Sequence, residues 1–177
     1  ALTRARPIHG DADFIDFIKD EIDEVLSAPR DTTKTAKDVR EMRDLIYQEK
    51  PPRDDWDFKL KPGGIVDLEF IAQFAVLTGK LVTEPRPLGT EDVLSGLNSS
   101  FADPASSDML VEAHRFYTNL SQTIRLCLGS DASREEFIPG MIDLLCRAAE
   151  LPDIKRVEHQ LAELATSVRA SFDELIK

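Results

Sequence analysis

Hydrophobic positions recur along this chain at steps of three and four residues, the period of an α-helix with one buried face. The first stripe, residues 14–26, predicts a helix that ends before Pro29. Either Asp11 or Asp13 can cap its start, because a short carboxylate accepts hydrogen bonds from the free amides of the first turn. A second helix is predicted from Thr33 to Gln48. Its apolar face carries four residues, Val39, Met42, Leu45 and Ile46.

Residues 65–77, IVDLEFIAQFAVL, are the most apolar segment of the chain. Hydrophobic side chains occupy almost every side of this predicted helix, so it belongs in the centre of a domain. The residues before it, 51–64, read PPRDDWDFKLKPGG and predict a linker of mixed charge.

Two further helices are predicted in the middle of the chain. A short one starts at the cap Thr90 and carries Val93, Leu94 and Leu97. A long one spans Ser106 to Leu128, with Gly129 as a natural stop.

The last fifty residues predict more helix. Residues 133–150 form one broken helix or two short ones, since Ser133 and Glu136 have capping-box spacing and Pro139 suits a first helical position. A final helix follows the cap Asp153 and repeats its apolar residues at near-heptad spacing. No segment alternates with period two for long enough to predict a strand. The fold class is therefore an all-α bundle of six or seven mostly antiparallel helices, without a sheet, in a single domain over residues 1–177.

Charge narrows the classes of function. The chain has 33 acidic and 22 basic residues, a net charge of −11. This balance argues against nucleic-acid binding and against a polybasic membrane surface, and no apolar stretch approaches the length of a membrane span. Two distant cysteines in apolar runs, Cys127 and Cys146, are interpreted as reduced core thiols, which predicts a cytoplasmic protein. The scattered histidines predict no metal site, and a start without Met suggests a piece of a longer protein.

One segment, KLKPGGIVDLEF at residues 59–70, stands out chemically. Asp67 and Glu69 lie two residues apart in a predicted central helix, so they cannot both point to water. A buried carboxylate needs a charge partner, a hydrogen-bond donor or a metal. One interpretation is structural: both acids start the helix and pair with arginines, the candidates being Arg40, Arg43 and Arg4. The other is functional, because amides after Gly63-Gly64 can receive a phosphate.

The segment GGIVDLEFIAQ, residues 63–73, resembles the GG-x-x-D-[IL]-EF-I-x-Q signature of bacterial glutamine synthetase adenylyltransferases, which are bifunctional adenylyltransferase and adenylyl-removing enzymes. Further stretches agree in order: ALTRAR at the start, PR at 29–30, VREMR at 39–43 and WDFK at 56–59. Pro62 departs from the pattern, which usually has a charged residue there. The match is strong over residues 1–77. Beyond them it rests on helical layout and on VRASFDELI near the end.

The resemblance implies a helical domain that follows a nucleotidyltransferase domain, with residues 1–10 as the tail of that domain. In such enzymes the adenylyltransferase half moves AMP from ATP to a tyrosine of glutamine synthetase, the other half removes it, and PII signal protein and glutamine regulate the balance. IVDLEF looks more like the C-terminal, adenylylating half. Mg²⁺ and ATP would bind in the absent domain, so this chain is not expected to bind a cofactor or to catalyse adenylyl transfer alone.

The resemblance also gives the segment a testable role. We expect Asp67 and Glu69 to face the catalytic cleft, where either would orient a donor or help deprotonate the target tyrosine. Lys59, Gly63 and Gly64 are the candidates for contact with the nucleotide. The predicted partners are the preceding nucleotidyltransferase domain, glutamine synthetase and PII. The alternatives are a free-standing helical adaptor and a fragment of a PII-uridylyltransferase.

Overall fold

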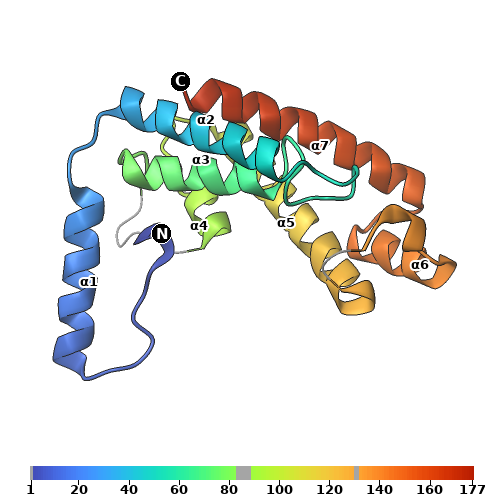
Figure 1. Ribbon diagram of the computed structural model, residues 1–177, viewed down its shortest axis with the longest axis horizontal. Helices are drawn as coiled ribbons and strands as arrows, with labels where there is room; N and C mark the ends of the chain where they lie inside the picture. The colour runs from blue at the N-terminus through green and yellow to red at the C-terminus, as the bar shows by residue number, and fades with distance from the viewer. Residues whose placement is uncertain (1, 83–88, 130–131) are drawn as a thin grey trace.

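The computed structural model describes residues 2–82, 89–129 and 132–177. These residues form an all-α bundle without a sheet; the one β-type pairing among them is an isolated bridge between Leu81 and Leu97. Figure 1 shows the helices, whose bounds are η1 (Leu2–Arg4), α1 (Ala12–Ser27), α2 (Thr32–Glu49), α3 (Ile65–Leu77), α4 (Thr90–Ser95), α5 (Pro104–Leu128), η2 (Arg134–Glu136), α6 (Pro139–Ala148) and α7 (Ile154–Leu175).

Helix α3 is the centre of the fold, as its all-round hydrophobicity predicted. It packs against α2, α4, α5 and α7, and it also contacts α1 and η1. Eight of its thirteen residues are buried, which agrees with a helix that has neighbours on nearly every side. Helices α5 and α7 cross behind and above it in Figure 1, and α6 fills the space between their far ends.

Helix boundaries follow the capping rules closely, with two corrections. Asp31 and Asp153 each accept a hydrogen bond at an N-cap, from the amides of Lys34 and Arg156. Helix α5 begins at Pro104 after the cap Asp103, two residues before the predicted start. The predicted cap Thr90 is wrong: Gly89 occupies that position and Thr90 is the first residue of α4.

Residues 133–150 form two short helices. Ser133 and Glu136 make both bonds of a capping box at η2, and α6 begins with Pro139. Gly129 ends α5 with a φ of 93°, a conformation that favours glycine. The sequence left one broken helix open as an alternative, and the structure decides for two.

The segment 51–64 is part of the core. Trp56 and Phe58 are buried, and Trp56 packs edge-on against Phe137 with ring centroids 4.9 Å apart. Phe58 stacks on Tyr117 of α5 at 6.0 Å. The expected linker is therefore an irregular strap that joins α2 to α3 and packs its aromatic side chains into the core.

Both cysteines are free. Cys127 is exposed, so the expectation of a core thiol is wrong for that residue, whereas Cys146 is partly buried and packs against the core. Within the described residues, no helix is long and apolar enough to span a membrane.

Candidate functional site

The start of α3 is a tight, fully bonded turn. Gly63 has a φ of +75°, and a Cβ there would lie 1.8 Å from the carbonyl oxygen of Ala165 in α7. A Cβ on Gly64 would lie 2.3 Å from the carbonyl oxygen of Phe58. Both glycines are therefore needed where backbone meets backbone. This close approach brings α3, α7 and the segment 51–64 together.

The amides of this turn already have acceptors inside the chain. Gly63 N–H donates to the Asp67 carboxylate at 2.7 Å, and Gly64 N–H donates to the carbonyl of Lys61 at 2.9 Å. The next amides, of Ile65 and Val66, bond to backbone carbonyls of the strap. The residues present thus do not fit a phosphate group in this arrangement, because no amide of the turn points free of a partner. The side chain of Lys59 is exposed.

Asp67 is enclosed by positive charge. Its side chain has 0% exposure. One carboxylate oxygen accepts from Arg43 Nε of α2, and the other lies 3.5 Å from an Nη of Arg169 on α7. The second oxygen also accepts the Gly63 amide. Asp67 therefore ties α2, α3 and α7 at one point, as a buried carboxylate with partners on every side.

The two arginines are held in place by further acceptors. Arg43, itself buried, donates to the carbonyls of Leu60 and Lys61 at 3.1 and 3.3 Å. Arg169 makes a bidentate pair with Asp173, at 2.7 and 3.1 Å, one turn along α7. The fixed geometry of both guanidinium groups orients the Asp67 carboxylate.

Glu69 points to the opposite side of α3 from Asp67, because two residues along an α-helix correspond to a rotation of about 200°. It pairs with Arg4 of η1 at 2.9 Å, and the side-chain exposures of the two are 28% and 52%. Nearby on α5, His114 lies 3.8 Å from Glu91, and the charges of Glu91 and Glu69 both act on its pKa. Burial nevertheless lowers the pKa of His114, and its Nδ1 has no hydrogen-bond partner among the described residues.

The two predicted acids are thus not brought together. Asp67 has the partners of the structural interpretation, with Arg43 as anticipated and Arg169 in addition; Glu69 has Arg4, also anticipated. Of the two carboxylates, Glu69 is the one that a molecule outside the bundle can reach. Arg169 was missed because nothing local links it to Asp67.

Sequence reasoning also missed Tyr117, which is fully buried in α5. Its hydroxyl finds no hydrogen-bond partner within the described part of the chain. Burial, and to a smaller extent the charge of Asp67, raise the pKa of Tyr117, so this hydroxyl stays protonated beside the ion pair. In the sequence Tyr117 is one more member of an apolar helical stripe, which gave no signal of its polar neighbour.

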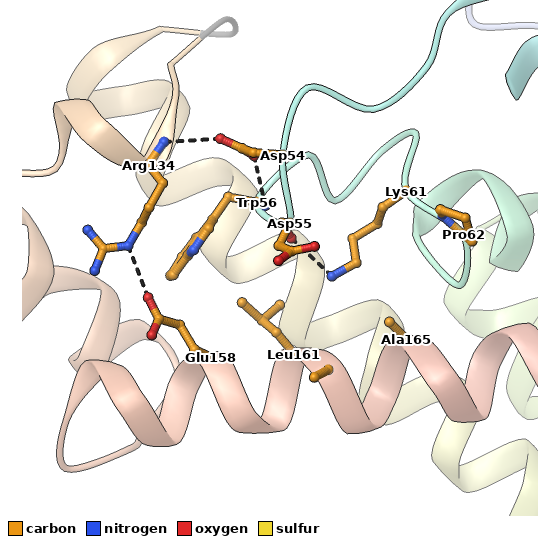
Figure 2. A pocket seen from close by; sticks show the side chains of 10 residues that line it. Asp54, Asp55, Trp56, Lys61, Pro62, Arg134, Glu158, Leu161 and Ala165 are labelled. Carbon is orange, nitrogen blue, oxygen red and sulfur yellow. Dashed lines mark hydrogen bonds and ion pairs between the residues drawn. The ribbon is translucent and has the colours of Figure 1, made fainter. Parts of the chain in front are cut away.

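A hollow of about 600 Å³ lies between the strap and α7 (Figure 2). Trp56 and Leu161 form apolar walls, and Lys61 reaches across to donate to the backbone carbonyl of Asp55 at 3.0 Å. At the far end Arg134 pairs with Glu158 at 3.0 Å and lies over the Trp56 ring. Burial lowers the pKa of Lys61, while Asp55 and Asp54 oppose that shift. Among the charged groups that line the hollow, Arg134 and Glu158 form an ion pair, whereas the Asp54 carboxylate accepts the backbone amides of Trp56 and Arg134.

The amino-acid sequence was compared with those of known proteins. No protein-family model matches it. Its homologues among characterised bacterial proteins carry the name bifunctional glutamine synthetase adenylyltransferase/adenylyl-removing enzyme, which confirms the resemblance seen in residues 63–73.

The protein of that name from Brucella suis biovar 1 is 65% identical over 176 residues, which cover 99% of this chain. Those from Mesorhizobium japonicum and Rhizobium meliloti are 44% and 42% identical over 100% and 99% of the chain. In each case the chain spans 18% of the relative's length. The chain is thus homologous, from end to end, to one region of these longer proteins.

Proposed function

We propose that residues 1–177 form a helical accessory domain of a glutamine synthetase adenylyltransferase. The observation that carries the proposal is the 65% identity over 99% of the chain to a protein of that name. The matched region covers 99% of the chain and so extends well beyond the motif at the start of α3. A free-standing adaptor is not favoured, because the matched region is a fixed fraction of each longer relative.

In this proposal the enzyme moves AMP from ATP to a tyrosine of glutamine synthetase and removes it again, in the cytoplasm, under control of PII. Mg²⁺ and ATP bind in the preceding nucleotidyltransferase domain, and the turn of Gly63 and Gly64 takes no part because it has no free amide for a phosphate. The bundle supplies a wall of the catalytic cleft. Nucleotidyl transfer depends on positioning and on charge stabilisation, which such a wall can give without covalent chemistry.

Glu69 is the residue of this chain that we assign to the cleft. It is partly exposed, and its partner Arg4 belongs to the segment that resembles the end of the catalytic domain. A carboxylate there can accept a hydrogen bond from the target hydroxyl or hold a donor in place. Lys59, also exposed, remains a candidate for contact with phosphate.

The test is Glu69→Gln in the full-length enzyme, with adenylylation of glutamine synthetase and thermal unfolding measured together. Because the Arg4–Glu69 pair is partly exposed, its loss should cost at most about 1 kcal/mol. Loss of a general base or positioning group should lower kcat by roughly 10²-fold or more. The control is Glu163→Gln, which changes an exposed acid on α7 and should leave kcat unchanged.

An unchanged kcat would contradict the cleft role of Glu69, and a lowered melting temperature beside it would leave Glu69 a packing role only. Absence of adenylylation by the wild-type enzyme would contradict the proposed function itself. Asp67→Asn does not provide this test, because it leaves Arg43 buried beside a neutral group. Loss of the Asp67 charge should lower the free energy of unfolding by about 3–5 kcal/mol and so lower the amount of folded enzyme.

A further inference from the structure

Helix α1 carries an apolar face that the bundle leaves uncovered. In Figure 1 it stands apart from the other helices, and Leu26 is its one buried residue. Phe14, Phe17 and Val25 are 59%, 55% and 46% exposed, and the two phenylalanine rings stack with centroids 6.5 Å apart. These positions lie on one side of the helix, at steps of three and eight residues. Exposed aromatic pairs of this kind mark an interaction surface.

Negative charge surrounds this face. Residues 11–27 contain one basic residue, Lys19, which pairs with Asp16 at 2.9 Å. Their acidic residues are Asp11, Asp13, Asp16, Asp20, Glu21, Asp23 and Glu24. A complementary surface must therefore offer an apolar patch ringed by lysine or arginine.

We propose that the face of Phe14, Phe17 and Val25 docks onto a basic, apolar surface of the same polypeptide, in the part of the enzyme outside residues 1–177. The inference rests on the proposed function. In the homologous proteins more than four-fifths of the polypeptide lies outside the matched region, which spans 18% of their length. A partner within the same polypeptide would cover the two stacked phenylalanine rings at all times. A transient partner would leave this apolar face exposed between binding events, which would promote aggregation.

The geometry favours this occupant further. Helix η1 contacts both α1 and α3, so any polypeptide joined before Leu2 emerges in the angle between α1 and the bundle. A second copy of this chain is a poor occupant. It would bring two faces of seven acidic residues each together, on molecules of net charge −11.

The test is photo-crosslinking in the full-length enzyme, with Phe17 replaced by p-benzoylphenylalanine, an aromatic side chain that exposure at this position accommodates. We expect an intramolecular crosslink to a peptide outside residues 1–177 that is rich in lysine or arginine, in a product that migrates as a monomer. The control places the same residue at Leu126, an apolar position on α5 that is 87% exposed, and should give little crosslinking.

Phe14→Ser together with Phe17→Ser should raise the amide hydrogen exchange of residues 12–27 in the full-length enzyme by about tenfold or more, because the docked face would lose its anchors. A crosslink between two copies, a crosslink to added glutamine synthetase, or yields equal to those at Leu126 would each overturn the proposal. None of these readouts depends on catalysis. Their failure is therefore distinguishable from failure of the adenylylation assay.

Discussion

At the scale of single residues, the backbone of a distant helix decides that position 63 must be glycine. Its amide donates to Asp67, while its missing side chain lets the turn touch Ala165 of α7. One glycine thus joins the start of the central helix to the last helix. The positive φ of Gly63 is a second, independent reason for glycine at this position. Gly79 has only this second reason: its φ is +67°, and a Cβ there would meet nothing within 4 Å.

Alanine substitutions at Gly63 and Gly79 distinguish the cost of backbone strain from the cost of a steric clash. Gly79→Ala should cost about 1–2 kcal/mol, the strain of a left-handed residue with a side chain. Gly63→Ala should cost more than about 4 kcal/mol or prevent folding, because the backbone of α7 must also move. Urea unfolding monitored by circular dichroism measures both. Equal losses for the two variants would contradict the close approach.

His114 is a partly buried titratable group with charged neighbours from three elements: Glu69 on α3, Glu91 on α4 and Arg115 on α5. Burial dominates and lowers the pKa of His114 below its unfolded value of about 6.5. The unfolded chain therefore binds a proton at a higher pH than the folded chain. Stability should fall as the pH drops through the unfolded pKa of about 6.5, because protons then favour the unfolded state.

His114→Gln should remove this contribution and flatten the fall in the free energy of unfolding as the pH drops through about 6.5. Urea unfolding at several pH values gives the slope. The matched control is His159→Gln, an exposed histidine on α7. Identical slopes for the two variants would show that His114 does not titrate in this way.

At the scale of elements, helix ends are decided locally. Asp153 accepts from the amide of Arg156 at 2.9 Å and fixes where the 22-residue α7 begins. That boundary matters beyond the helix, because α7 carries Ala165 toward Gly63 and Arg169 toward Asp67. A frayed first turn would loosen the wall of the hollow that Glu158 and Leu161 line.

Asp153→Ala should lower the free energy of unfolding by about 1 kcal/mol, whereas Asp153→Asn should retain most of it, since an amide oxygen also caps a helix. Thermal unfolding of the three proteins tests this. Equal losses for Ala and Asn would mean that the charge of Asp153, rather than its hydrogen bond, stabilises the start of α7.

At the scale of the whole molecule, the strap of residues 51–64 joins α2 to α3 and packs its aromatic side chains against residues much later in the chain. Trp56, the single tryptophan of the chain, is 7% exposed and packs against Phe58 and Phe137. Arg134 of η2 lies over the same ring at 5.8 Å. Segments far apart along the chain thus meet at this one side chain.

The fluorescence of Trp56 should therefore change together with the helical circular dichroism signal during urea unfolding, at the same midpoint. A free linker would instead give a tryptophan that is already solvated and quenched by acrylamide in the folded protein. An earlier, separate fluorescence transition would contradict the packing of the strap.

Much of this fold could be predicted because its signals are local. Helix periods, the cap Asp153, the capping box at Ser133 and the stop at Gly129 all act within a few residues, and each lies where the sequence placed it or close by. The same local pattern gave a wrong picture of α1, where part of the apolar stripe is exposed. An apolar stripe predicts a buried face but does not say which surface covers it. Met42 and Leu45 on α2 are likewise about half exposed.

That Asp67 and Glu69 need partners follows from the amino-acid sequence, because two carboxylates in an apolar helix cannot both reach water. Which partners they have depends on how the helices pack. Asp67 is closed off by Arg43 and Arg169, while Glu69 stays partly open beside Arg4. The physical reason is that helix formation depends on neighbours three and four residues away, whereas the partner of a charge depends on how helices far apart in the chain pack against one another.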